Sequence, residues 1–151
     1  MEASLNIYQS IKQDHHIQRK LLEQMLRTSG DTKNRSDLFD ELKAELAGHA
    51  NAEERHFYVP LIKLESTQGA ARHGMAEHHE IDELLEQLER TDPSSPVWLK
   101  YAKDLADKVR HHLSEEEVDY FPMVQKLLSE EKAELLGEAY LSARAKERIE
   151  A

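Results

Sequence analysis

The chain has 151 residues, which is enough for one domain with a substantial core. Charged residues make up 33% of it and aromatic residues 6%, with 5 Gly and 4 Pro. That composition favours long amphipathic helices over a sheet protein with many turns. A net charge of -10 argues against a nucleic acid partner, because Lys and Arg are needed to displace counterions from phosphates.

The composition also limits where the protein works and what can hold a metal in it. No apolar run is long enough to span a membrane, and the N-terminus lacks the basic start and apolar stretch of a secretory signal. We therefore expect a cytoplasmic protein. With 0 Cys, disulfides, thiolate zinc sites and cysteine-held iron–sulfur clusters are excluded. A metal would be held by His, by carboxylates or less often by Tyr.

Apolar side chains recur every three or four residues along four stretches of the chain. This period predicts helices over about residues 4–28, 36–65, 71–90 and 96–128. Pro60 and Pro122 lie inside two of these helices and should kink them. A shorter helix follows over about 130–148, and the sequence does not decide whether it covers the others or pairs with another copy.

The predicted fold class is all-α. Four main helices with short connections imply an up-down antiparallel four-helix bundle with a short additional C-terminal helix. We expect a single domain over residues 1–151, with the bundle at about 4–128. The clearest loop ends at Ser95, a favourable N-cap before Pro96, which suits the first turn of a helix.

An internal repeat is the strongest signal in the sequence. His78 lies 63 residues after His15, each preceded by an acid and followed by a second His. The same offset, without a gap, relates three further pairs, which are His49 and His112, Glu53 and Glu116, and Glu54 and Glu117. A repeat longer than one helix, with constant spacing, predicts two helix hairpins of one design that face each other.

Each copy of the repeat contains a His-x-x-x-Glu pair, formed by His49 with Glu53 and by His112 with Glu116. Residues four apart lie on one face of a helix, one turn above the other. Both pairs fall on the apolar stripe, where an unpaired carboxylate would be costly and a cation would make it tolerable. Imidazole nitrogens and carboxylate oxygens without sulfur suit iron, manganese or zinc.

The doubling of the pattern predicts a site for two metal ions. In an antiparallel hairpin, two residues face each other when their midpoint lies in the turn. The midpoint of His15 and His49 is Thr32, in a predicted loop. The midpoint of His78 and His112 is Ser95, in the predicted loop between the third and fourth helices, so the four histidines should converge at one level of the bundle.

These motifs resemble those of the hemerythrin-like, HHE cation-binding domain family, over about residues 4–128. The residues that carry the resemblance are Asp14-His15, His49 to Glu54, Glu77-His78, His112 to Glu117, and Phe121-Pro122. The resemblance implies two non-haem iron ions with an oxo or hydroxo bridge, with zinc or manganese as alternatives. Glu53 and Glu116 would be the bridging ligands. Matching positions imply six metal ligands in all: His15, His49, Glu53, His78, His112 and Glu116.

The sequence departs from the family at one position. Oxygen-carrying hemerythrins place a further His four residues before the equivalent of His78, where this chain has Gly74. His73 is adjacent but is rotated by about 100° around the helix. His56, three residues after Glu53, and its repeat partner Asp119 are the other candidate ligands. The departure argues against simple reversible oxygen transport.

The resemblance leaves three functions in competition. The first is a non-haem di-iron protein that binds or senses a small diatomic ligand, oxygen or nitric oxide, or that handles iron itself. The second is a di-iron enzyme that acts on peroxide or nitric oxide, although no motif indicates a substrate pocket or a catalytic residue. The third is a regulatory bundle that metal merely stabilises. The sequence predicts no membrane partner and does not predict the oligomeric state.

Overall fold

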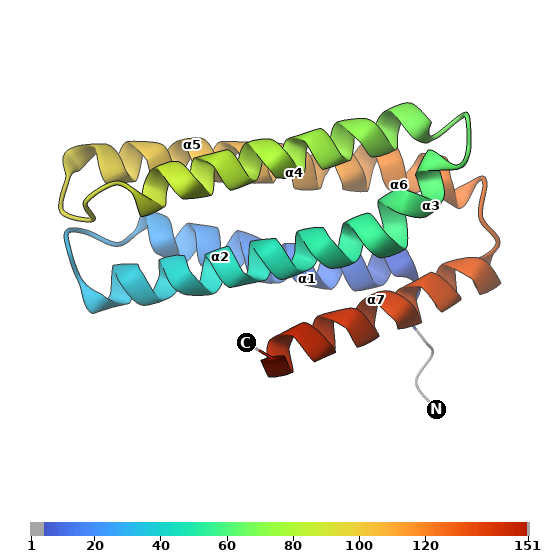
Figure 1. Cartoon of the computed structure of the whole chain (residues 1–151), viewed down its shortest axis with the longest axis horizontal. Helices are drawn as coiled ribbons and strands as arrows, with labels where there is room; N and C mark the ends of the chain where they lie inside the picture. The colour runs from blue at the N-terminus through green and yellow to red at the C-terminus, as the bar shows by residue number, and fades with distance from the viewer. Residues whose placement is uncertain (1–4, 151) are drawn as a thin grey trace.

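The structure is a computed structural model that describes residues 5–150 of the chain, which form helices joined by short turns. Four long helices run antiparallel to their neighbours (Figure 1), and they are α1 (Ile7–Leu26), α2 (Lys33–Glu53), α4 (Gln68–Glu89) and α5 (Pro96–Glu115). This confirms the predicted four-helix bundle. Among the described residues, no helix is both long and apolar enough to cross a membrane.

Local capping sets where the bundle helices begin. The Asn6 side chain accepts a hydrogen bond from the Gln9 backbone, and the Gln9 side chain accepts one from the Asn6 backbone, which makes a capping box at α1. Thr32 and Ser95 cap α2 and α5, so both predicted hairpin turns end at a cap. The predicted start of the first helix, at residue 4, lies outside the described residues.

Two π-helical turns interrupt the bundle helices, and the sequence did not predict them. η1 (Glu54–Tyr58) leads into α3 (Val59–Ile62), and η2 (Glu116–Tyr120) leads into α6 (Phe121–Gln125). Each short helix has a proline in its first two positions. A proline has no N–H and clashes with the carbonyl four residues earlier, and the widened turn accommodates this. The predicted kinks take this form, and the helices end at Ile62 and Gln125 rather than at 65 and 128.

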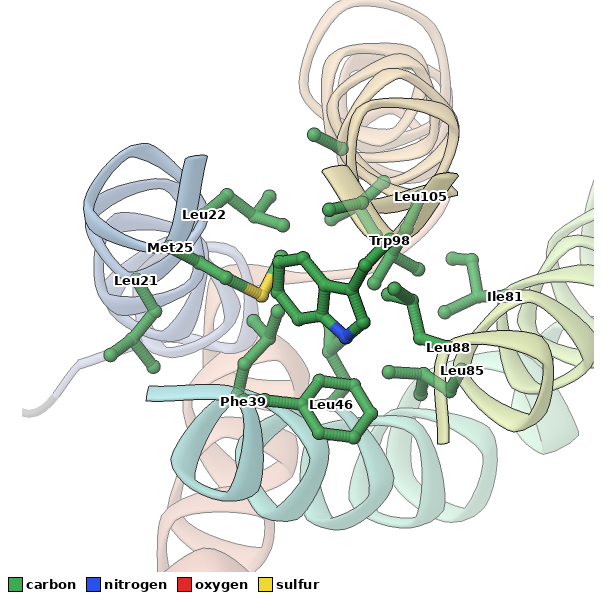
Figure 2. Packing of buried hydrophobic residues seen from close by; sticks show 14 of the residues in the cluster. Leu21, Leu22, Met25, Phe39, Leu46, Ile81, Leu85, Leu88, Trp98 and Leu105 are labelled. Atoms are coloured by element: carbon green, nitrogen blue, oxygen red, sulfur yellow. The ribbon is translucent and has the colours of Figure 1, made fainter. Parts of the chain in front are cut away.

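Two apolar clusters fill the bundle, one at each end. Figure 2 shows the cluster next to the α1–α2 and α4–α5 loops, where the Trp98 ring packs among Met25, Phe39 and Leu88. Trp98 is therefore a core residue. The second cluster lies at the opposite end and includes Ile11, Phe57, Phe121 and Tyr140. The histidines and glutamates of the repeat come between the two clusters along every bundle helix.

The C-terminal helix α7 (Glu130–Glu150) covers α1 and α2, on the side away from α4 and α5 (Figure 1). The sequence had left its role open. Two of its own side chains, Tyr140 and Arg144, are buried where it packs on the bundle. Gly48 makes this approach possible, because a Cβ at that position would overlap the Arg144 guanidinium group.

Candidate metal centre

The structure brings the six predicted ligands together in the middle of the bundle. All six are buried, with at most 5% of any of them exposed. Their donor atoms form two groups, each within 4.8 Å: one joins His15 and His49, the other joins His78 and His112, and both contain Glu53 and Glu116. Two sets of imidazoles that share two carboxylates can hold two cations side by side.

Glu53 lies between one imidazole of each helix hairpin. Its Oε1 is 2.9 Å from Nε2 of His78, and its Oε2 is 3.2 Å from Nε2 of His49. Neither pair has the angles of a hydrogen bond, so these four buried atoms lack a hydrogen-bond partner among the described residues, as does Nε2 of His112. Buried polar atoms without partners are costly. Cations bound among these atoms would satisfy all of them, so the donor set fits metal ions.

Glu116 lies between the other two histidines and a tyrosine. Its carboxylate oxygens are 3.0 Å from Nε2 of His15 and 3.3 Å from Nε2 of His112. The Tyr58 hydroxyl donates a hydrogen bond to the same carboxylate. Tyr58 occupies the space beside Gly74, where a Cβ would overlap its ring. The position of the missing fifth histidine is therefore filled by a phenol from the first π-turn, which can supply an oxygen ligand.

Every imidazole of the centre has a carboxylate on its other ring nitrogen. The distances from Nδ1 to the nearest oxygen of that carboxylate are 3.1 Å for His49 with Asp14, 3.0 Å for His78 with Glu54, 2.8 Å for His112 with Glu77 and 2.6 Å for His15 with Glu117. Such a partner orients the ring and makes the inward nitrogen a better ligand. The four acids are themselves two repeat pairs, so the repeat encodes this layer as well as the ligands.

Burial and charge together set the protonation of the centre. Burial alone would lower the pKa of His49, but the carboxylates of Glu53 and Asp14 raise it to about 10. Burial would raise the pKa of Glu77 and Glu117, but the imidazoles of His112 and His15 hold each near 2. Protons on the imidazoles thus balance the carboxylates, and a cation that binds here must displace them.

The helix α7 fixes the Asp14 carboxylate from outside the bundle. Nε of Arg144 is 2.8 Å from Asp14 Oδ2, and Nη2 of Arg148 is 2.9 Å from Oδ1. The Tyr140 hydroxyl also donates a hydrogen bond to Asp14 and lies 2.6 Å from Nδ1 of His49. Sequence reasoning missed these three residues, because α7 lies outside the repeat and carries no ligand pattern of its own.

Comparison with known proteins agrees with this geometry. The hemerythrin HHE cation binding domain family matches residues 6–124. The chain belongs to this family. A solved structure of a hemerythrin HHE cation binding domain-containing protein from Mycobacterium kansasii is similar, with a TM-score of 0.85 and 25% identity, covering 97% of this chain and 89% of that one.

A curated relative is longer than this HHE domain. It is a protein of Nostoc sp. named DNA nickase, 30% identical over 145 residues, which cover 96% of this chain but only 41% of the relative. The chain thus spans less than half the length of that relative. Membership of the family shows that the domain binds metal cations, whereas the ions' identity and number are matters for proposal.

A small cavity borders the centre of this HHE domain on the side of the first apolar cluster. Its volume is about 10 Å³, and its walls include three of the histidines and Gln18. The Gln18 side chain is fully buried, and neither atom of its amide has a hydrogen-bond partner among the described residues. A space of this size holds about one water-sized group. Gln18 can therefore hydrogen-bond to a small ligand placed there.

The remaining candidate ligands do not reach the centre. His56 is half-buried and its charged neighbours are Arg55 and Glu147, while Asp119 is exposed. Neither belongs to the two buried groups, so they do not replace the missing histidine. His73 is exposed, and it lies near the acids of a separate cluster on the surface. Three other histidines are exposed: His16, His79 and His111.

Proposed function

We propose that this HHE domain binds two non-haem iron ions and uses them to bind or sense a small diatomic ligand, oxygen or nitric oxide. The observation that supports two ions is the sharing of Glu53 and Glu116 by both groups of buried donors. Donors of nitrogen and oxygen without sulfur are compatible with iron. When bound, the ions would supply redox chemistry and an open coordination position.

The residues of the chain divide the work in this proposal. Glu53 and Glu116 would be shared by the two ions, and His15, His49, His78 and His112 would hold them from the four bundle helices. Tyr58 supplies an oxygen in place of the histidine that Gly74 replaces, because its hydroxyl already contacts the Glu116 carboxylate.

The cavity beside the centre supports ligand binding over turnover of a larger substrate. It holds about one water-sized group, and it is lined by apolar side chains such as Leu46 and Val109 together with the Gln18 amide. The Gln18 N–H would donate to a bound diatomic ligand and so favour one that carries negative charge. A substrate larger than a few atoms would not fit without movement of the helices.

The relative from Nostoc does not lead us to propose DNA as a partner. This chain matches only 41% of that protein, and its own net charge of -10 opposes binding to phosphates. We propose instead that the domain acts in the cytoplasm, without nucleic acid.

Metal analysis with stopped-flow absorption tests the proposal. Protein isolated with its own metal should contain two iron ions per chain, and the reduced form should develop a near-ultraviolet charge-transfer band on mixing with oxygen. A colourless protein that holds stoichiometric zinc and gives no change with oxygen or nitric oxide would contradict it.

The contribution of Tyr58 is tested by the Tyr58→Phe variant. A phenolate bound to oxidised iron absorbs broadly in the visible region, so the oxidised wild-type protein should show such a band and the variant should lack it. Tyr8→Phe is the matched control, since Tyr8 is buried in the same apolar cluster as Tyr58 but its hydroxyl has no hydrogen-bond partner among the described residues. An identical visible spectrum for Tyr58→Phe and the wild type would remove Tyr58 from the centre.

A further inference from the structure

A second cluster of metal-binding side chains lies on the outside of the bundle, where α4 and α5 face each other. It consists of two more His-x-x-x-Glu pairs, His73 with Glu77 on α4 and His111 with Glu115 on α5. Residues four apart share a helix face, so each pair presents an imidazole and a carboxylate to the other pair. None of the six buried donors of the centre is included.

His73, Glu77 and Glu115 offer donor atoms that all lie within 4.8 Å of one another, and a rotation of the exposed His111 side chain, which lies against the other oxygens of the same carboxylates, would complete a set for one ion. Nε2 of His73 is 2.9 Å from Oε1 of Glu115 and 3.6 Å from Oε1 of Glu77. Nε2 of His111 is 3.4 Å from Oε2 of Glu115 and 3.9 Å from Oε2 of Glu77. A tetrahedral zinc ion with bonds of about 2.0–2.1 Å separates its donors by roughly 3.3–3.4 Å. The two separations around His73 lie on either side of that value, and the two around His111 are at or above it.

We propose that His73, His111, Glu115 and Glu77 form a surface site for one divalent transition-metal cation of the zinc type, separate from the buried centre. Two imidazoles and two carboxylates from adjacent helices make a donor set typical of such cations. His73 and His111 are about half exposed, so an ion reaches the site from solvent. Glu77 is buried and Glu115 is mostly covered, so both are already held in place.

The internal repeat shows that this cluster is specific to one half of the molecule. The positions that correspond to His73, His111 and Glu115 in the first hairpin are Ser10, Gly48 and Ala52. These small residues belong to the hairpin against which α7 packs, and at Gly48 a side chain would overlap Arg144. In the first hairpin, which α7 covers, small residues at these three positions leave room for that helix. In the second hairpin, which α7 does not cover, the same positions carry metal-binding side chains.

Two neighbours modulate the site. Nζ of Lys108 is 3.4 Å from Oε2 of Glu77 and 2.5 Å from Glu80, so its charge partly competes with a cation. The Tyr120 hydroxyl donates at 2.6 Å to Oε1 of Glu115, the same oxygen that lies 2.9 Å from Nε2 of His73, and so holds that carboxylate in place. Glu77 also accepts a hydrogen bond from Nδ1 of His112 at 2.8 Å. Its carboxylate would therefore contact both an ion on the surface and a histidine of the buried centre.

Titration of the metal-loaded protein with Zn²⁺ tests the proposal. The protein is used with its buried centre filled, and calorimetry follows the added Zn²⁺ while metal analysis confirms that the original ions stay bound. Wild-type protein should take up one further equivalent. His73→Ala and His111→Ala each remove one ligand. Each should therefore lower the affinity for Zn²⁺ by about tenfold or more, since loss of a residue that only supports a ligand already has an effect of that size.

Two further variants make the test specific. His79→Ala removes another exposed histidine that pairs with an acid four residues later, Glu83, and it should leave the affinity unchanged. Lys108→Gln removes the competing charge and should tighten binding. The proposal is overturned if the wild type binds no further equivalent, or if His73→Ala and His111→Ala bind as tightly as His79→Ala does. Because the buried centre is filled beforehand, either result leaves the proposed di-iron function untouched.

Discussion

Asp14 and Glu77 occupy equivalent positions in the two helix hairpins, and each accepts a hydrogen bond from an imidazole of the centre, but only Asp14 is covered by a further helix. Around Asp14, α7 places the buried Arg144 guanidinium and the Tyr140 hydroxyl. Around Glu77 the cation is the partly exposed Lys108, 3.4 Å away. The repeat thus sets the same inner chemistry twice and leaves the outer surroundings different.

The difference has an energetic meaning. A buried ion pair is expensive to break by removal of one partner, because the other charge stays buried without compensation. A surface ion pair contributes little, since water and salt screen it. The first hairpin therefore depends on α7 for its charge balance, whereas the second hairpin balances its charge with solvent and with surface side chains that a cation can also use.

The largest expected effect comes from removal of the basic side chain beside Asp14, compared with removal of the basic side chain beside Glu77. Arg144→Ala should lower the free energy of unfolding of the metal-free protein by about 3–5 kcal/mol, because it removes the buried arginine partner of Asp14 and leaves only the partly exposed Arg148. Lys108→Ala, the equivalent change in the open half, should cost only about 0–1 kcal/mol. Urea denaturation of both variants measures the difference. Equal losses would mean that α7 does not distinguish the two halves.

An intermediate effect is expected from the carboxylates themselves. Asp14→Asn and Glu77→Gln each weaken the support of one ligand imidazole, and each should lower the affinity for metal by roughly 10–100-fold. The loss should be greater for Asp14→Asn, which also removes one of the ion-pair partners of the buried Arg144. Competition with a chelator measures both affinities, with the exposed Asp119→Asn as the control. A wild-type affinity for Asp14→Asn would show that the outer carboxylate is dispensable.

The smallest effect concerns Gln18, whose repeat partner in the other hairpin is Ile81. Both residues line the small cavity, but only the amide of Gln18 is a buried polar group without a partner. Gln18→Leu should raise the free energy of unfolding of the metal-free protein by about 1 kcal/mol, since such a group costs roughly 1–3 kcal/mol. It should also weaken azide binding by the oxidised protein. Gln13→Leu, at an exposed position, is the control, and a destabilised Gln18→Leu protein would contradict this account.

Much of the centre could be predicted because it depends on patterns along single helices. The period of three and four residues locates the bundle helices, and the 63-residue offset relates His15 to His78 and His49 to His112. The structure brings these residues together as the repeat predicts. Even the layer of outer acids was visible in the repeat, although its contact with the Nδ1 atoms was not deduced from it.

The rest of the centre depends on contacts that no local pattern specifies. Tyr140 and Arg144 reach Asp14 from positions more than 120 residues later in the chain. Tyr58 turns toward the centre because it lies in a π-turn and because Gly74 leaves space for its ring. The substitution at Gly74 was recognised in the sequence, but the side chain that fills the space comes from another helix. A gap on one helix does not say which residue of its neighbour occupies it.

Anomalous diffraction at the iron absorption edge, from crystals of protein isolated with its own metal, tests the central claim most directly. We expect two peaks inside the bundle, both at bonding distance from Glu53 and Glu116. One peak should also contact His15 and His49, and the other should contact the remaining two histidines. A single buried peak, or an ion that touches only one of the two glutamates, would contradict the dimetal centre.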